Sequence, residues 1–122
     1  RHVFFTEVKE GKLEEYIKYH DNIFPEVVAG LRTTGVVSLQ IFNVPCTRQL
    51  VLIIETAGDI DLDKATGPGS KYRENARCKE WEEMMDADFH GGWTKCKDVH
   101  SSDREWNLAL GPPTVGQAPP SA

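Results

Sequence analysis

Two periodicities of hydrophobic and polar residues divide the first part of the chain. Residues 2–8 alternate with a period of two, which is typical of a strand with one buried face. Residues 13–31 place apolar side chains three and four positions apart, which predicts an amphipathic helix. Pro25 interrupts this pattern, so we expect one helix to end near Phe24 and a second to begin there. Gly35 is expected to end the second helix.

The remaining sequence predicts a hairpin, a further helix and a last strand. Residues 36–42 alternate again, with Val37, Leu39 and Ile41 on one face. Residues 49–56 form the most apolar stretch and pair with them as the second arm of the hairpin. The other expected elements are a loop over 57–71, a helix over 72–88 and a strand over 106–110.

This order of elements, βαββαβ, is that of the ferredoxin-like arrangement. We therefore predict an α+β fold in which the helices cover one face of an antiparallel sheet. No predicted element remains to cover the opposite face. An apolar sheet face left bare should line a pocket or meet a second copy of the chain. We expect a homodimer, with the functional site between the sheet and the partner.

The composition indicates one globular domain followed by a tail. Residues 1–110 are assigned to the domain, and residues 111–122, with four of the seven prolines and no charge, to a Pro-rich flexible tail. The formal net charge of −5 argues against nucleic acid or an anionic membrane as a partner. Three widely spaced cysteines without a C-x-x-C motif predict reduced thiols and a cytoplasmic protein, with a single disulfide as the alternative.

His20 is the histidine whose position most suggests chemistry. It follows Tyr16 by one helical turn on the apolar side of the first helix, so an imidazole and a phenol would point together toward the sheet. A histidine in this place can also be structural, but the pairing with Tyr16 and the nearby proline favour a function. Of the others, His2 and His100 are expected to be solvated. His90 follows an acidic helix end, where the helix dipole favours a cation.

Two tryptophans and a run of acids complete the candidate chemistry. Trp81 and Trp93 could stack on a ligand, as aromatic rings do on the apolar face of a sugar, and Trp81 could equally pack in the core. The acidic residues between positions 80 and 88 predict a solvated helix face. Nucleotide-binding glycine motifs, a nucleophile elbow and a calcium loop are missing from the sequence, and we expect neither a metal nor a cofactor.

The spacing of several of these residues resembles that of the L-rhamnose mutarotase family. The family pattern is Tyr-x-x-x-His, an aromatic-Pro-Glu triplet and a glycine before a strand. Tyr16, His20, the triplet at 24–26 and Gly35 occupy these places here. VVSLQIF and LVLIIE resemble the second and third strands of the family, and EWEEMM around Trp81 resembles its second helix. The similarity runs over roughly residues 3–93.

The resemblance implies a dimeric α+β barrel and an isomerase that interconverts the α and β anomers of a 6-deoxyhexose, L-rhamnose or L-fucose. It implies His20 as the catalytic proton donor and Tyr16 and Trp81 as substrate contacts. Two positions differ from the rhamnose-specific members, which carry a tyrosine in place of Leu39 and a second tryptophan in place of Glu82. Members tied to L-fucose share the Trp-Glu form, so the resemblance leaves the sugar open.

Mutarotation requires proton transfer and neither a metal nor a covalent intermediate. A proton must reach the ring oxygen of the monosaccharide and another must leave its anomeric hydroxyl. We predict that His20 supplies the proton, because imidazole titrates near neutral pH, and Glu82 is a candidate for the second group. Alternatives on the same fold are a cofactor-free monooxygenase, a stress-responsive barrel protein, and a binding module without catalysis.

Overall fold

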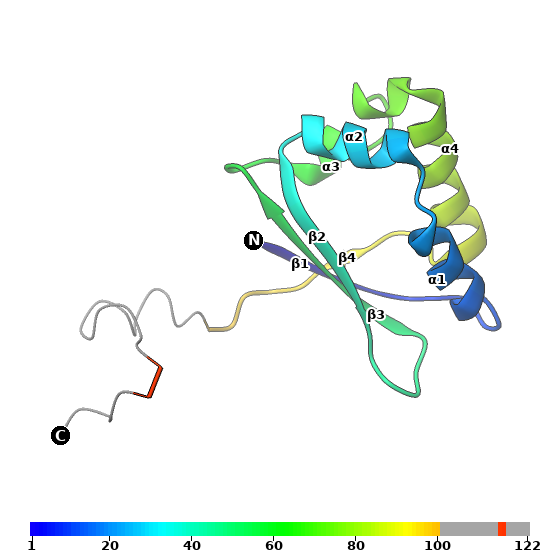
Figure 1. Cartoon of the computed structure of the whole chain (residues 1–122), viewed down its shortest axis with the longest axis vertical. Coiled ribbons are helices and arrows are strands. Elements are labelled where there is room, and N and C mark those ends of the chain that lie inside the picture. Colours follow the sequence, from blue (N-terminus) through cyan, green and yellow to red (C-terminus); the bar gives the residue numbers. More distant parts are fainter. Residues whose placement is uncertain (101–114, 117–122) are drawn as a thin grey trace.

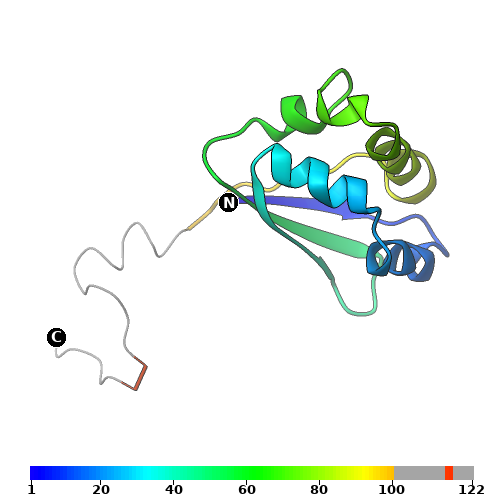
Figure 2. The same ribbon diagram turned by 45° about the horizontal axis from the view of Figure 1, so that its top comes forward.

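A four-stranded antiparallel sheet lies under a layer of helices in the computed structural model, which describes residues 1–100 and 115–116 (Figure 1). The strands are β1 (His2–Glu7), β2 (Val36–Asn43), β3 (Gln49–Thr56) and β4 (Thr94–Lys95). The helices are α1 (Leu13–Asp21), α2 (Pro25–Thr33), α3 (Leu62–Thr66) and α4 (Ala76–Met84). The described helices all lie on the same side of the sheet (Figure 2).

The strand order is β2-β3-β1-β4, and every neighbouring pair is antiparallel. Together with the order of elements along the chain, this confirms the predicted ferredoxin-like α+β fold. The predicted hairpin is the β2–β3 pair. In the β1–β3 pair, Phe4 lies opposite Leu52 and Phe5 lies opposite Val51, so successive residues of β1 face opposite sides of the sheet.

Pro25 divides the first helical layer as predicted. The chain leaves α1 at Asp21, and Phe24, with an extended backbone, precedes Pro25 at the first position of α2. At the other end of α2, Gly35 has a φ of 102°. A Cβ atom at this position would lie 2.5 Å from Ile60 Cδ1, so both the backbone conformation and the space require glycine.

The predicted loop and second helix need correction. Residues 57–71 contain the short helix α3, which begins where the Asp61 carboxylate accepts a hydrogen bond from the backbone N–H of Lys64. The helix expected over 72–88 is divided into a 3₁₀ turn (Tyr72–Glu74), α4 and a π-helical turn (Met85–Phe89). The 3₁₀ turn is separate from α4 because Asn75 caps a new helix there. Its side chain accepts hydrogen bonds from the backbone N–H groups of Arg77 and Cys78 in the first turn of α4.

Within the described residues, the fourth strand of the sheet is a segment that the sequence pattern did not predict. β4 pairs with β1 through Thr94 and Lys95, in a polar stretch whose sequence gave no clear strand pattern. The strand expected at 106–110 lies outside the described residues, as does nearly all of the predicted tail. A two-residue strand is too short for a hydrophobic period to reveal it.

A bulge at the start of β2 changes which side chains face the helices. The pairing passes from Val36–Thr56 to Ser38–Glu55, so β2 has one extra residue. As a result Val36 is buried and Val37 is 67% exposed. The prediction that Val37 shares a face with Leu39 and Ile41 is therefore wrong.

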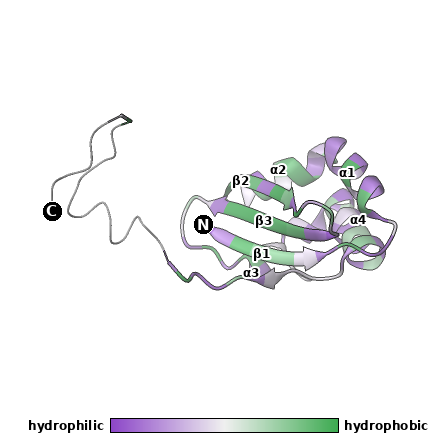
Figure 3. Ribbon diagram, turned by 90° about the horizontal axis from the view of Figure 1, so that it is seen from below, coloured by the Kyte–Doolittle hydropathy of each residue, from purple (hydrophilic) through white to green (hydrophobic). Residues whose placement is uncertain are grey.

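The hydrophobic core fills the space between the helices and the sheet. Its main cluster joins α1, α2, α4 and the two turns that flank α4 to the sheet, and its buried members are Val8, Tyr16, Val27, Leu50, Tyr72, Cys78, Trp81, Met85 and Phe89. The sheet lies in front of the helices in Figure 3, and β3 is hydrophobic along much of its length. On the face away from the helices, β3 contributes Val51 and Ile53, which lie opposite Phe5 and Val3 of β1. On this face, Phe5 and Phe42 are exposed. Within the described residues, no helix is both long and apolar enough to cross a bilayer.

Candidate active site

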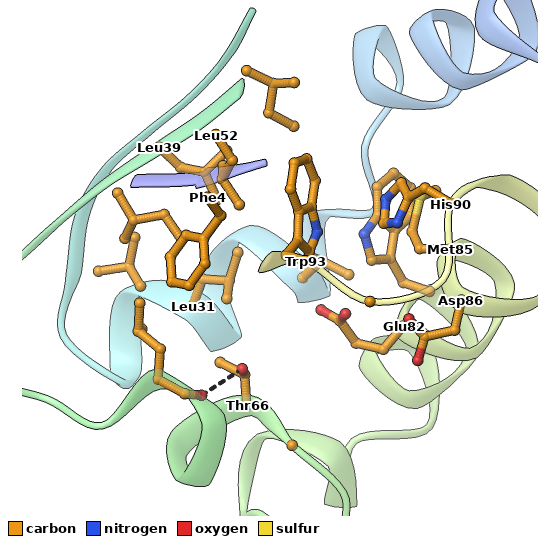
Figure 4. Close-up of a pocket in the computed structure, with 18 of the residues that line it drawn as sticks. Phe4, Leu31, Leu39, Leu52, Thr66, Glu82, Met85, Asp86, His90 and Trp93 are labelled. Carbon is orange, nitrogen blue, oxygen red and sulfur yellow. Dashed lines mark hydrogen bonds between the residues drawn. The ribbon is translucent and has the colours of Figure 1, made fainter. Parts of the chain in front are cut away.

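A cavity of about 400 Å³ lies between the sheet and the helices of this single chain. One end of it is apolar, and residues of the sheet and of α2 line it: Phe4, Leu31, Val36, Leu39, Leu52 and Ile54. The other end carries titratable and aromatic side chains: Tyr16, His20, Trp81, Glu82, Asp86, His90 and Trp93. Figure 4 shows Trp93 between the two ends. The predicted location between the sheet and a partner chain is therefore wrong, because the candidate residues lie under the chain's own helices.

Tyr16 and His20 lie together in the cavity, as their spacing predicts. Their ring centroids are 4.2 Å apart. The Nδ1 atom of His20 is 2.9 Å from the carbonyl oxygen of Tyr16, which can only accept, so Nδ1 carries the proton and donates it. Burial is the main cause that lowers the pKa of His20. The ring is thus mainly neutral at pH 7, with its lone pair on Nε2.

The hydroxyl of Tyr16 is buried without a hydrogen-bond partner among the described residues. The side chain is 3% exposed, and it lines the cavity. Burial raises the pKa of Tyr16, and the nearby carboxylate of Glu82 raises it further, so the phenol stays protonated. An unsatisfied buried polar group costs about 1–3 kcal/mol. A polar ligand in the cavity would remove that cost.

Trp81 belongs both to the core and to the wall of the cavity. It is 4% exposed, and its ring centroid lies 5.1 Å from that of His20 and 5.1 Å from that of Phe24. The guanidinium of Arg77 lies over the Phe24 ring, with Cζ 3.5 Å from the ring centroid. These contacts fix the indole beside the imidazole. Trp81 can therefore have both of its predicted roles, packing in the core and contact with a ligand.

Glu82 lines the cavity, although the sequence predicted that the acidic residues of this helix would all be solvated. Its neighbours Glu80 and Glu83 are exposed, but Glu82 is half-buried and accepts a hydrogen bond of 2.9 Å from the hydroxyl of Tyr72. Burial is the largest cause that raises the pKa of its carboxyl group. The sequence carries a signal for this placement, because Glu82 follows buried Cys78 by one helical turn.

His90 also belongs to the site, and the sequence did not indicate it. Its Nδ1–H donates to the carbonyl oxygen of Gly91 at 2.6 Å, and its ring lies 5.5 Å from Tyr16 and 4.8 Å from Trp93. Burial lowers the pKa of His90, so the expectation of a cation at the helix end is wrong. The π-helical turn before His90 buries Phe89 and turns the imidazole into the cavity, and no local pattern predicts such a turn.

These side chains are suited to proton transfer on a small polar molecule. Two neutral imidazoles, a carboxyl group with a raised pKa, a phenol without a partner and an indole surround one space. In residues 1–100 and 115–116, no three His, Cys, Asp or Glu side chains are grouped as a metal ion would require. General acid–base chemistry needs groups whose pKa values lie near the working pH.

Comparison with known proteins identifies the chemistry. The family model of L-rhamnose mutarotase matches residues 1–110. Among solved structures, the chain is similar to the crystal structure of an L-rhamnose mutarotase from Formosa agariphila, with a TM-score of 0.62 and 20% sequence identity. That likeness covers 82% of this chain and 95% of the other, and at this identity it concerns the fold. No curated protein sequence matches the chain.

The family match makes the protein a sugar mutarotase, an isomerase that acts on carbohydrates. The chain belongs to the L-rhamnose mutarotase family.

Proposed function

We propose that the cavity interconverts the α and β anomers of a 6-deoxyhexose, L-rhamnose or L-fucose, by acid–base opening of the ring. The pair of Tyr16 and His20 supports this proposal most strongly. A buried hydroxyl without a partner lies beside an imidazole whose Nδ1 is held by the backbone. A sugar offers hydroxyl groups to both side chains, and its exchange of anomers needs no chemistry beyond proton transfer.

The sequence suggests that His20 supplies the proton during ring opening, but in the neutral ring its one N–H is held by the carbonyl oxygen of Tyr16. His20 is therefore proposed to move the proton of the anomeric hydroxyl. In the neutral ring, Nε2 takes this proton while the C1–O1 bond becomes a carbonyl, the C1–O5 bond breaks, and O5 receives a proton. After rotation about C1–C2, O5 attacks the other face of the carbonyl. The imidazolium then returns its proton to O1, so His20 is the proton donor during closing. A positioned acid–base group contributes about 10²–10⁴-fold to such a rate.

Tyr16 and Trp81 are proposed to hold the sugar. The unpartnered Tyr16 hydroxyl would bond to a sugar hydroxyl, and the Trp81 indole would cover the apolar face of the pyranose. The apolar end of the cavity supports a substrate with a methyl group at C6. Phe4, Leu39 and Leu52 line that end, and they offer no partner to a C6 hydroxyl. Because a hydrophobic pocket rejects an added hydroxyl only moderately, discrimination against L-mannose is expected to reach about 10²-fold.

We also propose a homodimer formed through the open face of the sheet. Phe42 is 50% exposed there and Val37 is 67% exposed, both on a face that no described element covers. The cytoplasm is the proposed location, since the exposed thiols of Cys46 and Cys96 fit a reducing compartment. Residues 1–110 are proposed to form the enzyme domain, with residues 111–122 as a tail.

Saturation-transfer NMR on the anomeric protons tests this function. The purified protein is mixed with L-rhamnose, L-fucose, L-mannose and common aldoses, and exchange is compared with that in buffer. We expect acceleration for a 6-deoxyhexose, its loss in His20→Ala, and its retention in Lys18→Ala, an exposed position of the same helix. Exchange at the buffer rate for every sugar would refute the proposal, and oxygen uptake with phenolic substrates would instead support a monooxygenase.

A further inference from the structure

We propose that Glu82 is the second catalytic residue of the cavity, giving a proton to the ring oxygen while His20 takes the proton of the anomeric hydroxyl, and that Tyr72 is its positioning residue. This inference rests on the proposed mutarotase function and gives a definite role to Glu82, which the sequence named only as a candidate for the second proton-transfer group.

The carboxyl group of Glu82 is held in one orientation at the wall of the cavity. Its Oε1 accepts from the Tyr72 hydroxyl at 2.9 Å, which leaves Oε2 for a ligand. Tyr72 is itself 5% exposed, and its ring packs against α2 so closely that a Cβ atom at Gly30 would lie 2.9 Å from it. Figure 4 shows Glu82 projecting from its helix into the cavity on the side of Trp93 and Asp86.

Glu82 and His20 surround the same space. Trp81, the residue that precedes Glu82, has its ring 5.1 Å from the ring of His20. The charge of Glu82 also acts on Tyr16, whose ring is 4.2 Å from the ring of His20. All four side chains line the cavity, so one small ligand can meet the acid and the base together.

The environment favours the neutral form of both groups. Burial raises the pKa of Glu82, and Asp86 raises it as well, against the opposing effects of the Tyr72 hydrogen bond and of Arg73. Burial lowers the pKa of His20. The two pKa values therefore shift toward each other, which favours a protonated carboxyl group beside an unprotonated imidazole.

The other titratable side chains at this end of the cavity fit the role of proton donor less well. His90 in its neutral form has its one N–H engaged with the carbonyl of Gly91, so it can only accept at Nε2. The phenol of Tyr16 has a raised pKa and is a poor source of protons. Asp86 is exposed to solvent. Glu82 is the remaining carboxyl that combines partial burial with a fixed geometry.

The proton balance of the step is complete without any further reagent. On opening, the Glu82 proton passes to O5, whose bond to C1 breaks with its electron pair. The anomeric proton passes to His20 Nε2, and its bonding pair forms the carbonyl. The cavity then holds a carboxylate and an imidazolium. Closing on the opposite face returns both protons, and the enzyme regains its starting state.

The test compares Glu82→Gln with Glu83→Gln, its exposed neighbour on the same helix. The amide can still accept from Tyr72, so the fold is expected to be kept, and circular dichroism checks this. We expect anomer exchange of L-rhamnose and L-fucose to fall about 10²–10⁴-fold in Glu82→Gln and to stay unchanged in Glu83→Gln. Tyr72→Phe is expected to retain part of the rate and to shift the alkaline limb of the pH–rate profile upward, because the Tyr72 hydrogen bond lowers the pKa of Glu82.

Carboxyl ¹³C NMR with labelled glutamate gives a second readout that needs no sugar. A glutamate that titrates above the ordinary range, and that disappears in Glu82→Gln, is expected. If wild type and Glu82→Gln exchange anomers equally while His20→Ala does not, the role of Glu82 is refuted and the proposed function stands. If wild type accelerates no sugar, the proposed function itself is refuted. An ordinary titration of every glutamate would also overturn the assignment.

Discussion

The two faces of the sheet differ in chemistry although the same strands build them. On β1, Phe4 and Thr6 face the helices, and the buried Thr6 hydroxyl donates to the carbonyl of Gly92 at 3.1 Å. Val3 and Phe5 face the other side, opposite Ile53 and Val51. The helix-covered face forms the floor of a cavity whose titratable groups all come from the helical layer, most of them from α1, α4 and the turn after α4. The open face is mainly apolar.

Each face of the sheet lacks a different kind of partner. The cavity holds a buried hydroxyl without a partner and ionisable groups whose pKa values burial has shifted, and both features cost stability unless a ligand uses them. The open face exposes aromatic and aliphatic side chains, whose burial would be favourable. The first face therefore calls for a polar small molecule, and the second for another apolar surface.

Removal of an aromatic ring should be far more costly on the covered face than on the open one. Trp81→Ala is expected to lower the free energy of unfolding by about 3–5 kcal/mol, because Trp81 is 4% exposed in the core. Phe42→Ala, at a half-exposed position, is expected to cost much less within one protomer. Urea unfolding of monomeric samples measures both, and equal losses would show that the open face is packed.

Tyr16→Phe should separate stability from function. Deleting the unpartnered hydroxyl is expected to raise the free energy of unfolding by about 1–3 kcal/mol, since a buried unsatisfied group is removed. The same change should weaken sugar binding and raise KM in the exchange assay. Unfolding curves with and without sugar provide the measurement. A destabilised variant would mean that the hydroxyl has a structural partner in the folded protein.

A charge on the open face should break the dimer and leave the chemistry in place. Phe42→Asp is expected to weaken association at least tenfold, or about 1.4 kcal/mol, because a carboxylate would have to be buried at the interface. Sedimentation velocity over a range of concentrations measures this. A wild-type protein that is monomeric at all concentrations would contradict the proposed homodimer.

The free energy of unfolding should depend weakly on pH, with opposite signs for the buried histidines and for Glu82. The folded-state pKa values of His20 and His90 lie below the ordinary 6.5, so their contribution to stability is present above pH 6.5 and is lost as the pH falls. His2 acts in the same direction. For Glu82 the folded pKa is raised, so stability is lost as the pH rises through it. We expect Glu82→Gln to be more stable than wild type at pH 8, and the difference to vanish below pH 4.5, the ordinary value.

The sequence predicted much of this fold because its strongest signals are local. The period of two in β1, β2 and β3, Pro25 at the helix start and Gly35 at the helix end each act within a few residues. The pair of Tyr16 and His20 is local in the same way, since one helical turn separates the two residues. The elements that were missed, α3 and β4, are short and polar.

Apart from the spacing of one helical turn between Cys78 and Glu82, the rest of the site depends on contacts that no local pattern contains. Glu82 is distinguished from its acidic neighbours by Tyr72, which is ten positions away in sequence and belongs to a separate turn. His90 enters the cavity because of a π-helical turn. The position of the cavity could not be predicted either, because its depth depends on how far the helices stand from the sheet, and this distance is set by the packing of the whole core.

The most direct test of the account compares one variant of each face in a single assay. Anomer exchange of L-rhamnose and L-fucose is measured by saturation transfer for wild type, His20→Ala and Phe42→Asp at equal protomer concentration. We expect acceleration by wild type, exchange near the buffer rate for His20→Ala, and exchange by Phe42→Asp close to that of wild type. Full activity in His20→Ala, with loss in Phe42→Asp, would place the reaction on the open face and contradict the account.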